Sequence, residues 1–295
     1  MSRIDEAMRR AGAVQAPVER IDIHMGGRLQ HYTGEPRTSP FNRPARDGRK
    51  AVSAVVVPPG GPLTALSALD PTLRRKTILG EAPPPLVEQF RRLAVAVHEL
   101  QVEQGLRMLL VTSTLPNEGK TLTAVNLALT LSESCGRRVL LVDADLRRPF
   151  LHKIFQLPND RGLAAALISG DGAVEPIRVS QNLTVLPAGT VDQPMALASD
   201  RLSSLLERWA ANSDVVLIDA APVGVMPDAQ LLARLTRAVL FVIAAHATPE
   251  AMVTRAIAEI GQECVIGTVL NGVDDDDIPA ADYYNAYYPA GHSAE

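Results

Sequence analysis

The amino-acid sequence predicts an α/β fold in which a central, mostly parallel sheet is flanked by helices. From Leu106 onward, short runs rich in leucine and β-branched residues alternate with stretches of helix length. Several of these runs are apolar at every position, so both faces of each strand must be covered, which is typical of a parallel sheet. Acidic residues follow two of the runs, at the sheet edge where such folds bind ligands.

The N-terminal part of the chain shows little periodic pattern. Residues 1–85 are rich in Arg, Gly, Pro and Ala, and we expect a flexible leader that closes with the stiff linker APPPL at 82–86. Short helices are expected within it at 4–12 and near 71–79. The first long helix is expected at 87–101, where one apolar stripe contains Val87, Phe90, Leu93, Ala94 and Val97.

Six strands are expected after this helix, separated by helices. They are 107–113, 138–144, 183–188, 214–220, 238–245 and 265–271. The pattern ends at Val273, and residues 274–295 are expected to form a disordered, exposed tail. The expected organisation is therefore a leader (1–85), one folded domain (86–273) and a tail.

The composition argues against several classes of protein. With 46% apolar residues the chain can form a sizeable core, and a net charge of −4 argues against nucleic-acid binding. The two cysteines, Cys135 and Cys264, have neither metal-ligand spacing nor the density of a disulfide scaffold, which favours a reducing, cytoplasmic setting. The apolar runs are far shorter than the roughly 20 residues needed to span a bilayer. Work at a membrane would therefore require recruitment.

The segment VTSTLPNEGKT, from Val111 to Thr121, has the pattern of a phosphate-binding loop. In such a loop a tight turn directs backbone N–H groups at an anion, Lys120 adds a positive charge, and the Thr121 hydroxyl is placed to hold Mg²⁺. The match is partial, because the first glycine of the pattern GxxxxGK[ST] would fall on Thr114. On this motif alone, an ordinary strand-to-helix turn remains the alternative.

Three aspartates follow two of the expected strands. Asp143 and Asp145 come after one, and Asp219 ends another. A phosphoryl-transfer site needs hard oxygen ligands for Mg²⁺ and an acceptor that orients the attacking hydroxyl. Each aspartate alone could cap a helix or begin a turn. All three together with EGKT predict a nucleotide site.

The tyrosines are concentrated at the C-terminus. Four of the five lie within the last 13 residues, namely Tyr283, Tyr284, Tyr287 and Tyr288. They are candidate phosphoacceptors; a docking peptide or a sticky tail is the alternative. The 12 residues from Asn271 to Tyr283 span roughly 40 Å when fully extended, which permits transfer within one subunit or to a neighbour.

The segments TSTLPNEGKT, VLLVDADLRRP and VVLIDAAPV together resemble the Walker A, A′ and B motifs of bacterial tyrosine autokinases of capsule and exopolysaccharide synthesis. FQLPNDRGLAAALISG, NLTVLPAG and TVLNGV are also similar to that family. The resemblance implies a P-loop NTPase fold that uses ATP and Mg²⁺ to phosphorylate its own C-terminal tyrosines. It further implies a homo-oligomer such as a ring, control by a membrane chain-length regulator (a polysaccharide co-polymerase), and reversal by a tyrosine phosphatase. The opening IDEAMRRAG is similar to the leader of kinases encoded separately from their membrane partner, so we expect a cytoplasmic protein held at the inner face of the membrane through that partner.

The resemblance also implies roles for individual residues. Lys120, Asp143 and Asp145 are expected to be catalytic, and Thr121, Asp145 and Asp219 to organise Mg²⁺. Which of Asp143 and Asp145 holds metal-bound water and which accepts the tyrosine proton stays open. Asn271 is placed to read adenine, with a simple turn residue as the alternative. The residues expected to bind the nucleotide along the loop are Ser113, Pro116, Asn117, Glu118, Gly119, Lys120, Thr121 and Leu122.

The chain departs from the family pattern at a few positions. Asn117 replaces the glycine most common before EGK, and asparagine also accepts left-handed backbone angles. The oligomerisation motif of the family is a Glu and two Arg at three-residue spacing. Glu88 and Arg91 match it, but the third position is Ala94. Either the subunits assemble more weakly than in the family, or Arg92 takes the place of the missing arginine.

Two other functions compete with the kinase. One is a partitioning-type ATPase switch, whose relatives carry an extra lysine where this chain has Leu115. The other is a non-catalytic nucleotide-binding scaffold of a polysaccharide export complex, in which the tail would be a docking peptide.

Overall fold

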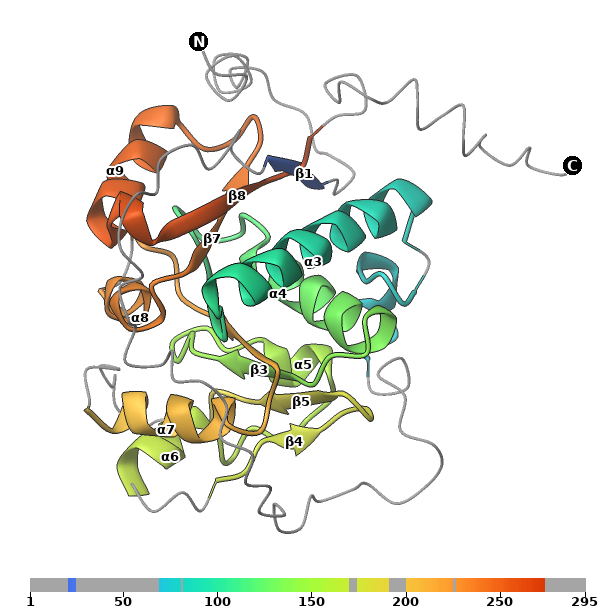
Figure 1. Ribbon diagram of the computed structural model, residues 1–295, viewed down its shortest axis with the longest axis vertical. Helices are drawn as coiled ribbons and strands as arrows, with labels where there is room; N and C mark the ends of the chain where they lie inside the picture. The colour runs from blue at the N-terminus through green and yellow to red at the C-terminus, as the bar shows by residue number, and fades with distance from the viewer. Residues whose placement is uncertain are drawn as a thin grey trace, which may run out of the picture.

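Within the residues that the structure describes, eight strands form one sheet in the order β1-β8-β7-β2-β6-β3-β5-β4 (Figure 1). The computed structural model describes residues 21–24, 69–80, 82–169, 174–190, 200–224 and 227–273. The strands are β1 (Ile21–His24), β2 (Met108–Ser113), β3 (Val139–Asp143), β4 (Ile177–Arg178), β5 (Leu183–Leu186), β6 (Val215–Asp219), β7 (Val239–Ala244) and β8 (Val265–Asn271).

The interior of this sheet is parallel, which confirms the predicted fold class. The neighbouring strands β8, β7, β2, β6, β3 and β5 all pair in parallel, and they correspond to the six strands expected from the sequence. Two short edge strands were not expected: β1 pairs antiparallel with β8, and β4 pairs antiparallel with β5. A strand of four or two residues is too short to show a periodic pattern.

Helices cover both faces of the sheet (Figure 1). The packing of the core places α3, α4, the π-helix η2 and α5 on one face and α6, α7, α8 and α9 on the other. The helices are α3 (Pro84–Gln104), α4 (Lys120–Leu129), η2 (Thr130–Ser134), α5 (Leu151–Ile154), α6 (Leu163–Ser169), α7 (Asp200–Ala210), α8 (Asp228–Thr236) and α9 (Glu250–Ile260), with short 3₁₀ helices η1 (Arg74–Lys76) and η3 (Gln262–Cys264).

Each face of the sheet has its own hydrophobic core. Along β2, Met108 and Leu110 belong to one core, whereas Leu109 and Val111 belong to the other. Successive side chains of a strand point to opposite faces, so a strand buried on both sides must be apolar at every position. The uninterrupted apolar runs in the sequence follow from this arrangement.

Helix α3 begins and ends where its sequence requires. Two prolines occupy its first turn, where backbone N–H groups have no acceptor within the helix, so the N–H that proline lacks costs no hydrogen bond. Gly105 ends the helix with a left-handed φ of 67°. Of the predicted stripe, Val87 is half-buried, and the other four residues are buried.

The domain begins before residue 86, where the sequence placed the end of a flexible leader. Strand β1 pairs with β8, and residues 69–80 pack against α4 and α5, with Leu69 fully buried. The Asn126 side chain on α4 accepts the Ile78 N–H (2.9 Å) and donates to the Lys76 carbonyl (3.0 Å). The helix expected near 71–79 is only the short η1, and the one expected at 4–12 lies outside the described residues.

We expect Asn126→Ala to lower the free energy of unfolding by about 2 kcal/mol, because it leaves a backbone donor and a backbone acceptor without partners. Urea denaturation measures this change. The matched control is Asn212→Ala at an exposed position, expected to change stability by less than about 0.5 kcal/mol. Equal effects of the two substitutions would show that Asn126 does not hold residues 69–80.

Candidate nucleotide-binding site

The sheet register brings the predicted site residues to one edge. Strand β6 lies between β2 and β3, and Asp219 at its end is paired with Val111 of β2 and with Asp143 of β3. The turn that follows β2 leads directly into α4, which begins at Lys120. The carboxyl ends of three parallel strands and a helix N-terminus therefore meet at one place, the arrangement that α/β folds use to bind phosphates.

Two residues of the turn adopt left-handed backbone angles, Asn117 with φ 67° and Gly119 with φ 91°. The expectation that Asn117 takes the place of a glycine is confirmed. Gly119 has a second restriction, because a Cβ there would lie 2.1 Å from Nδ2 of Asn271. Asn271 Nδ2 donates to the Glu118 carbonyl (3.1 Å), so its amide contacts the loop itself.

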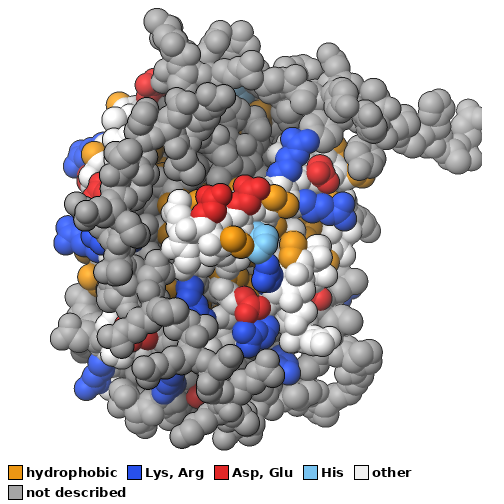
Figure 2. All heavy atoms as spheres, viewed as in Figure 1, with side chains coloured by type: hydrophobic (Ala, Val, Ile, Leu, Met, Phe, Trp, Pro, Cys, Tyr) orange, Lys and Arg blue, Asp and Glu red, His pale blue; other side chains and the backbone are white. Residues whose placement is uncertain are grey.

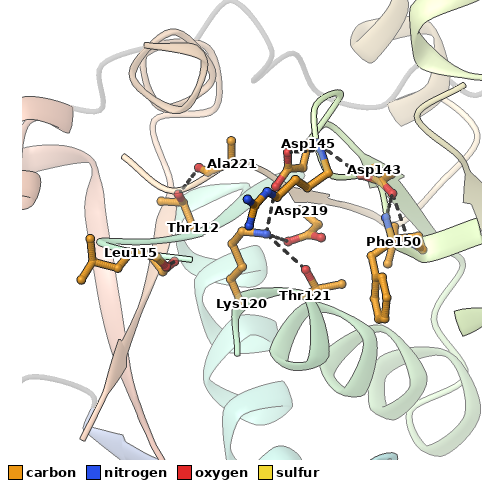
Figure 3. A network of polar contacts seen from close by, with 12 residues as sticks. Thr112, Leu115, Lys120, Thr121, Asp143, Asp145, Phe150, Asp219 and Ala221 are labelled. Carbon is orange, nitrogen blue, oxygen red and sulfur yellow. Dashed lines mark hydrogen bonds and ion pairs between the residues drawn. The ribbon is translucent and has the colours of Figure 1, made fainter. Parts of the chain in front are cut away.

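Lys120 occupies the centre of the site (Figure 3). Its Nζ lies 3.2 Å from Oδ2 of Asp145 and 3.8 Å from Oδ1 of Asp219, and it donates to the Thr121 hydroxyl at 3.3 Å. Only 11% of the Lys120 side chain is exposed. The structure thus brings together four of the residues that the sequence assigned to catalysis and Mg²⁺.

Asp143 makes a different set of contacts from its neighbours. One of its oxygens accepts the N–H groups of Phe150 (2.9 Å) and Leu151 (3.0 Å), and the other accepts the Asp145 N–H (3.2 Å) (Figure 3). Asp145 accepts the Arg148 N–H through Oδ1 and presents Oδ2 to Lys120. Asp143 therefore shapes the connection to α5, whereas Asp145 faces the ammonium.

Burial dominates the electrostatics of the site. It raises the pKa of Asp143 to about 7, and the nearby Asp219 carboxylate adds to the effect. It also raises the pKa of Asp219 to about 6, against the opposing influence of Lys120 and the Thr121 hydroxyl. Burial alone would lower the pKa of Lys120, but Asp219 and Asp145 outweigh it and the pKa rises. Lys120 thus stays charged, and the carboxyl groups outnumber the cation facing them.

This excess of carboxyl groups suits a metal cation that binds together with the phosphates of a nucleotide. Within the described residues, no three His, Cys, Asp or Glu side chains are grouped so as to hold a metal ion by themselves. Mg²⁺ in nucleotide sites uses one or two carboxylates with phosphate and water oxygens, and Thr121, Asp145 and Asp219 offer that kind of partial set. Two buried oxygens here have no hydrogen-bond partner, Oδ1 of Asp219 and Oγ1 of Thr114. The residues present fit ATP-Mg²⁺.

The remaining loop residues separate into two groups. Pro116 and Asn117 are exposed, and Gly119 and Leu122 are partly exposed. Ser113 is buried and donates to the Leu115 carbonyl (2.9 Å). The Glu118 side chain is also buried, turned into the protein rather than toward the opening of the site.

Two threonines that help to build the site were not predicted from the sequence. Thr112 donates to the Ala221 carbonyl (2.8 Å), and the Thr248 hydroxyl contacts Glu118. Nothing in their sequence context distinguishes them from other threonines, because their partners are distant along the chain.

Other predicted residues lie elsewhere or outside the described residues. Glu88 and Arg91 sit on α3 and approach each other to 3.8 Å. The tail tyrosines fall within residues 274–295, which the structure does not describe. None of the described helices is both long and apolar enough to cross a bilayer.

Comparison with known proteins gives a consistent result. The model of the CobQ/CobB/MinD/ParA nucleotide-binding domain matches residues 109–283. The tyrosine-protein kinase YwqD of Bacillus subtilis is 30% identical over 207 residues, which are 68% of this chain and 87% of that protein. The succinoglycan biosynthesis transport protein ExoP of Rhizobium meliloti is 31% identical over 220 residues, 70% of this chain and 28% of that protein. The solved BceF tyrosine kinase domain superposes with a TM-score of 0.59 at 31% identity, covering 71% of this chain and 89% of that one.

In nucleotide-free protein kept in EDTA, we expect stability to fall as the pH rises from about 4 to about 7. The raised pKa of Asp143 means that the folded state holds its proton more tightly than the unfolded chain does. That contribution is fully present below the unfolded pKa, is lost as the pH passes the folded pKa, and is on the order of 4 kcal/mol.

Urea denaturation across this range measures the slope, and Asp143→Asn should reduce it to the part that comes from the raised pKa of Asp219. Asp214→Asn is the control, because Asp214 pairs with Arg138 and its pKa is lowered, so it does not titrate through the upper part of this range. A slope unchanged by Asp143→Asn would contradict the assignment.

Proposed function

Because the chain belongs to the bacterial tyrosine-protein kinases and carries their CobQ/CobB/MinD/ParA-type nucleotide-binding domain, we propose that it transfers the γ-phosphoryl group of ATP to its own C-terminal tyrosines. The chain is a protein-tyrosine kinase by family. The observation that carries the proposal is the position of Lys120 at the start of α4, within 3.8 Å of both Asp145 and Asp219. An ammonium and two carboxylates beside a phosphate-binding loop are the groups that phosphoryl transfer from a nucleotide requires, and the family relationship favours tyrosine over water as the acceptor.

The loop residues supply the binding groups for the phosphates. Backbone N–H groups at the start of α4 and the Lys120 ammonium would contact phosphate oxygens, and Thr121 and Asp219 would hold Mg²⁺. Mg²⁺ held there would neutralise the negative charge that develops on the phosphate during transfer. The ion pairs of Lys120 keep it protonated for this task.

We propose that Asp145 rather than Asp143 accepts the proton of the reacting tyrosine hydroxyl. The tyrosine oxygen attacks the γ-phosphorus, the bond to the β–γ bridging oxygen breaks, ADP leaves, and the tyrosine proton passes to a carboxylate. Both oxygens of Asp143 already accept backbone N–H groups. Oδ2 of Asp145 faces only Lys120, so it becomes free when the ammonium turns toward phosphate. We assign the proton to Asp145 and a positioning role to Asp143.

The acceptor tyrosines are Tyr283, Tyr284, Tyr287 and Tyr288, and we propose that they enter the site of a neighbouring copy. Helix α3 offers a surface for such assembly, with exposed Arg91, Arg92 and Val95 along its middle and exposed Glu103 near its end. Figure 2 shows side chains of both charges over the position of α3. Opposite charges at separate positions along one helix suit contact between copies.

The wider role is proposed from the relatives. One of them, ExoP, is named as a succinoglycan biosynthesis transport protein. We propose that this kinase regulates exopolysaccharide chain length or export. It would work in the cytoplasm at the inner face of the membrane, through a membrane chain-length regulator, and a tyrosine phosphatase would reverse its action.

We expect Lys120→Met to lower the rate of autophosphorylation by at least about a hundredfold, because the charge that neutralises the phosphates is lost. Intact-mass spectrometry with ATP and Mg²⁺ counts the phosphoryl groups gained. The matched control is Lys76→Met on η1, where the lysine is exposed. ADP formation by the unaltered chain without a gain of mass would favour the ATPase switch, and nucleotide binding without turnover would favour the scaffold.

We expect phosphoryl groups to disappear when all four tail tyrosines are changed to phenylalanine, with ADP binding unchanged. Mixing this variant with the Lys120→Met chain separates the two routes of transfer, because the first has an intact site and the second intact acceptors. Phosphorylation of the Lys120→Met chain in the mixture would demonstrate transfer between subunits. An unmodified Lys120→Met chain in the mixture, beside a fully active unaltered protein, would place the transfer within one subunit.

A further inference from the structure

Glu118 lies inside the phosphate-binding loop, yet its side chain is turned away from the phosphate side. The residue is 3% exposed and stands between the two left-handed residues Asn117 and Gly119. A carboxylate with so little exposure loses most of its hydration, so it must be compensated by donors from the protein. Its carboxylate oxygens accept hydrogen bonds from two backbone N–H groups and one hydroxyl.

The donors come from two separate parts of the fold. Oε2 of Glu118 accepts the Leu115 N–H at 2.5 Å, at the beginning of the same loop. Oε1 accepts the Thr248 hydroxyl, in the connection between β7 and α9, and, at 3.5 Å, the N–H of Ala244, the last residue of β7. One carboxylate thus joins the start of the loop to a segment more than a hundred residues later.

A third contact ties the backbone of the same residue to β8. The Glu118 carbonyl accepts Nδ2 of Asn271 at 3.1 Å. The loop is therefore linked to the ends of both β7 and β8 through Glu118. Asn117 beside it holds a left-handed φ of 67°, which asparagine adopts more readily than other non-glycine residues.

We propose that Glu118 is a positioning residue, whose carboxylate holds the phosphate-binding loop in its binding shape before nucleotide arrives by bridging Leu115 and Thr248. The proposal rests on the nucleotide site proposed above. It assigns the Glu118 side chain to the loop rather than to the ligand. Without the bridge the loop must be ordered by the nucleotide itself, at the expense of affinity.

The loop serves the ground state and the transition state alike, so losing the bridge should raise the KM for ATP and leave kcat nearly unchanged. We expect Glu118→Ala and Thr248→Val each to raise the KM and the Kd of ADP-Mg²⁺ about tenfold, with kcat within about twofold of the original. Autophosphorylation rates give KM and kcat, and a fluorescent ADP analogue gives Kd. Thr184→Val, whose hydroxyl donates to the Val139 carbonyl in the sheet, is the matched control and should change neither constant.

Two further variants separate positioning from general stability. Glu118→Gln can still accept the Leu115 N–H and can donate its amide to the Thr248 oxygen, so it should restore most of the affinity. If the bridge is one unit, combining Glu118→Ala with Thr248→Val should weaken binding no more than Glu118→Ala alone. Urea denaturation of each variant identifies any that does not fold, in which case Thr248→Val and Glu118→Gln carry the test.

The proposal is overturned if Thr248→Val binds ADP-Mg²⁺ as tightly as the original chain, if the two substitutions are additive, or if Glu118→Gln binds as weakly as Glu118→Ala. Failure of the original chain to bind ADP-Mg²⁺ would overturn the nucleotide site as well. Normal binding by the original chain together with any of the first three results would overturn only the role of Glu118.

Discussion

The parallel pairing of β6 with β2 and β3 sets the position of every charged group in the site. It places Asp219 level with Asp143 at the sheet edge, and both become buried as helices cover the two faces. Buried carboxylates are costly unless they meet a positive charge or hydrogen-bond donors. Lys120 supplies the charge for Asp219 and Asp145, and the backbone beyond β3 supplies donors for Asp143. The start of α4 and the path of the chain toward α5 are thus both dictated by the sheet.

Polar side chains that bind backbone groups, more than pairs of side chains, hold the loops of this fold in place. Asn126 fastens the segment before α3, Thr112 fastens the residues after β6, and Asp143 fastens the turn before α5. Each is buried, and each satisfies groups that would otherwise be unpaired. Such contacts fix a loop without a regular element, which is how an edge built from strand ends and turns stays ordered enough to receive a ligand.

Much of the fold and the chemistry of the site could be predicted from the sequence, because both depend on local patterns. Apolar runs identified the six interior strands, and the residues beside Lys120 followed from the positions of strand ends. The strands β1 and β4 and the packed segment 69–80 could not be predicted, since partners far along the chain stabilise them. Glu118 was expected to bind nucleotide from its place in the loop motif, and its contact with Thr248 could not be predicted because that partner lies 130 residues further along the chain.

The close approach of Gly119 to Asn271 sets a limit on how sequences of this architecture can diverge. Any side chain at position 119 would both require an unfavourable backbone and displace the amide that reaches the Glu118 carbonyl. Replacing Asn271 would make room for a side chain at position 119 but would also remove the amide that binds the Glu118 carbonyl, so neither residue can be substituted alone without loss of a contact. The end of β8 and the beginning of α4 are therefore matched to each other, and exchanging either segment alone for one of different sequence would put a side chain against the Asn271 amide or leave the Glu118 carbonyl without that donor.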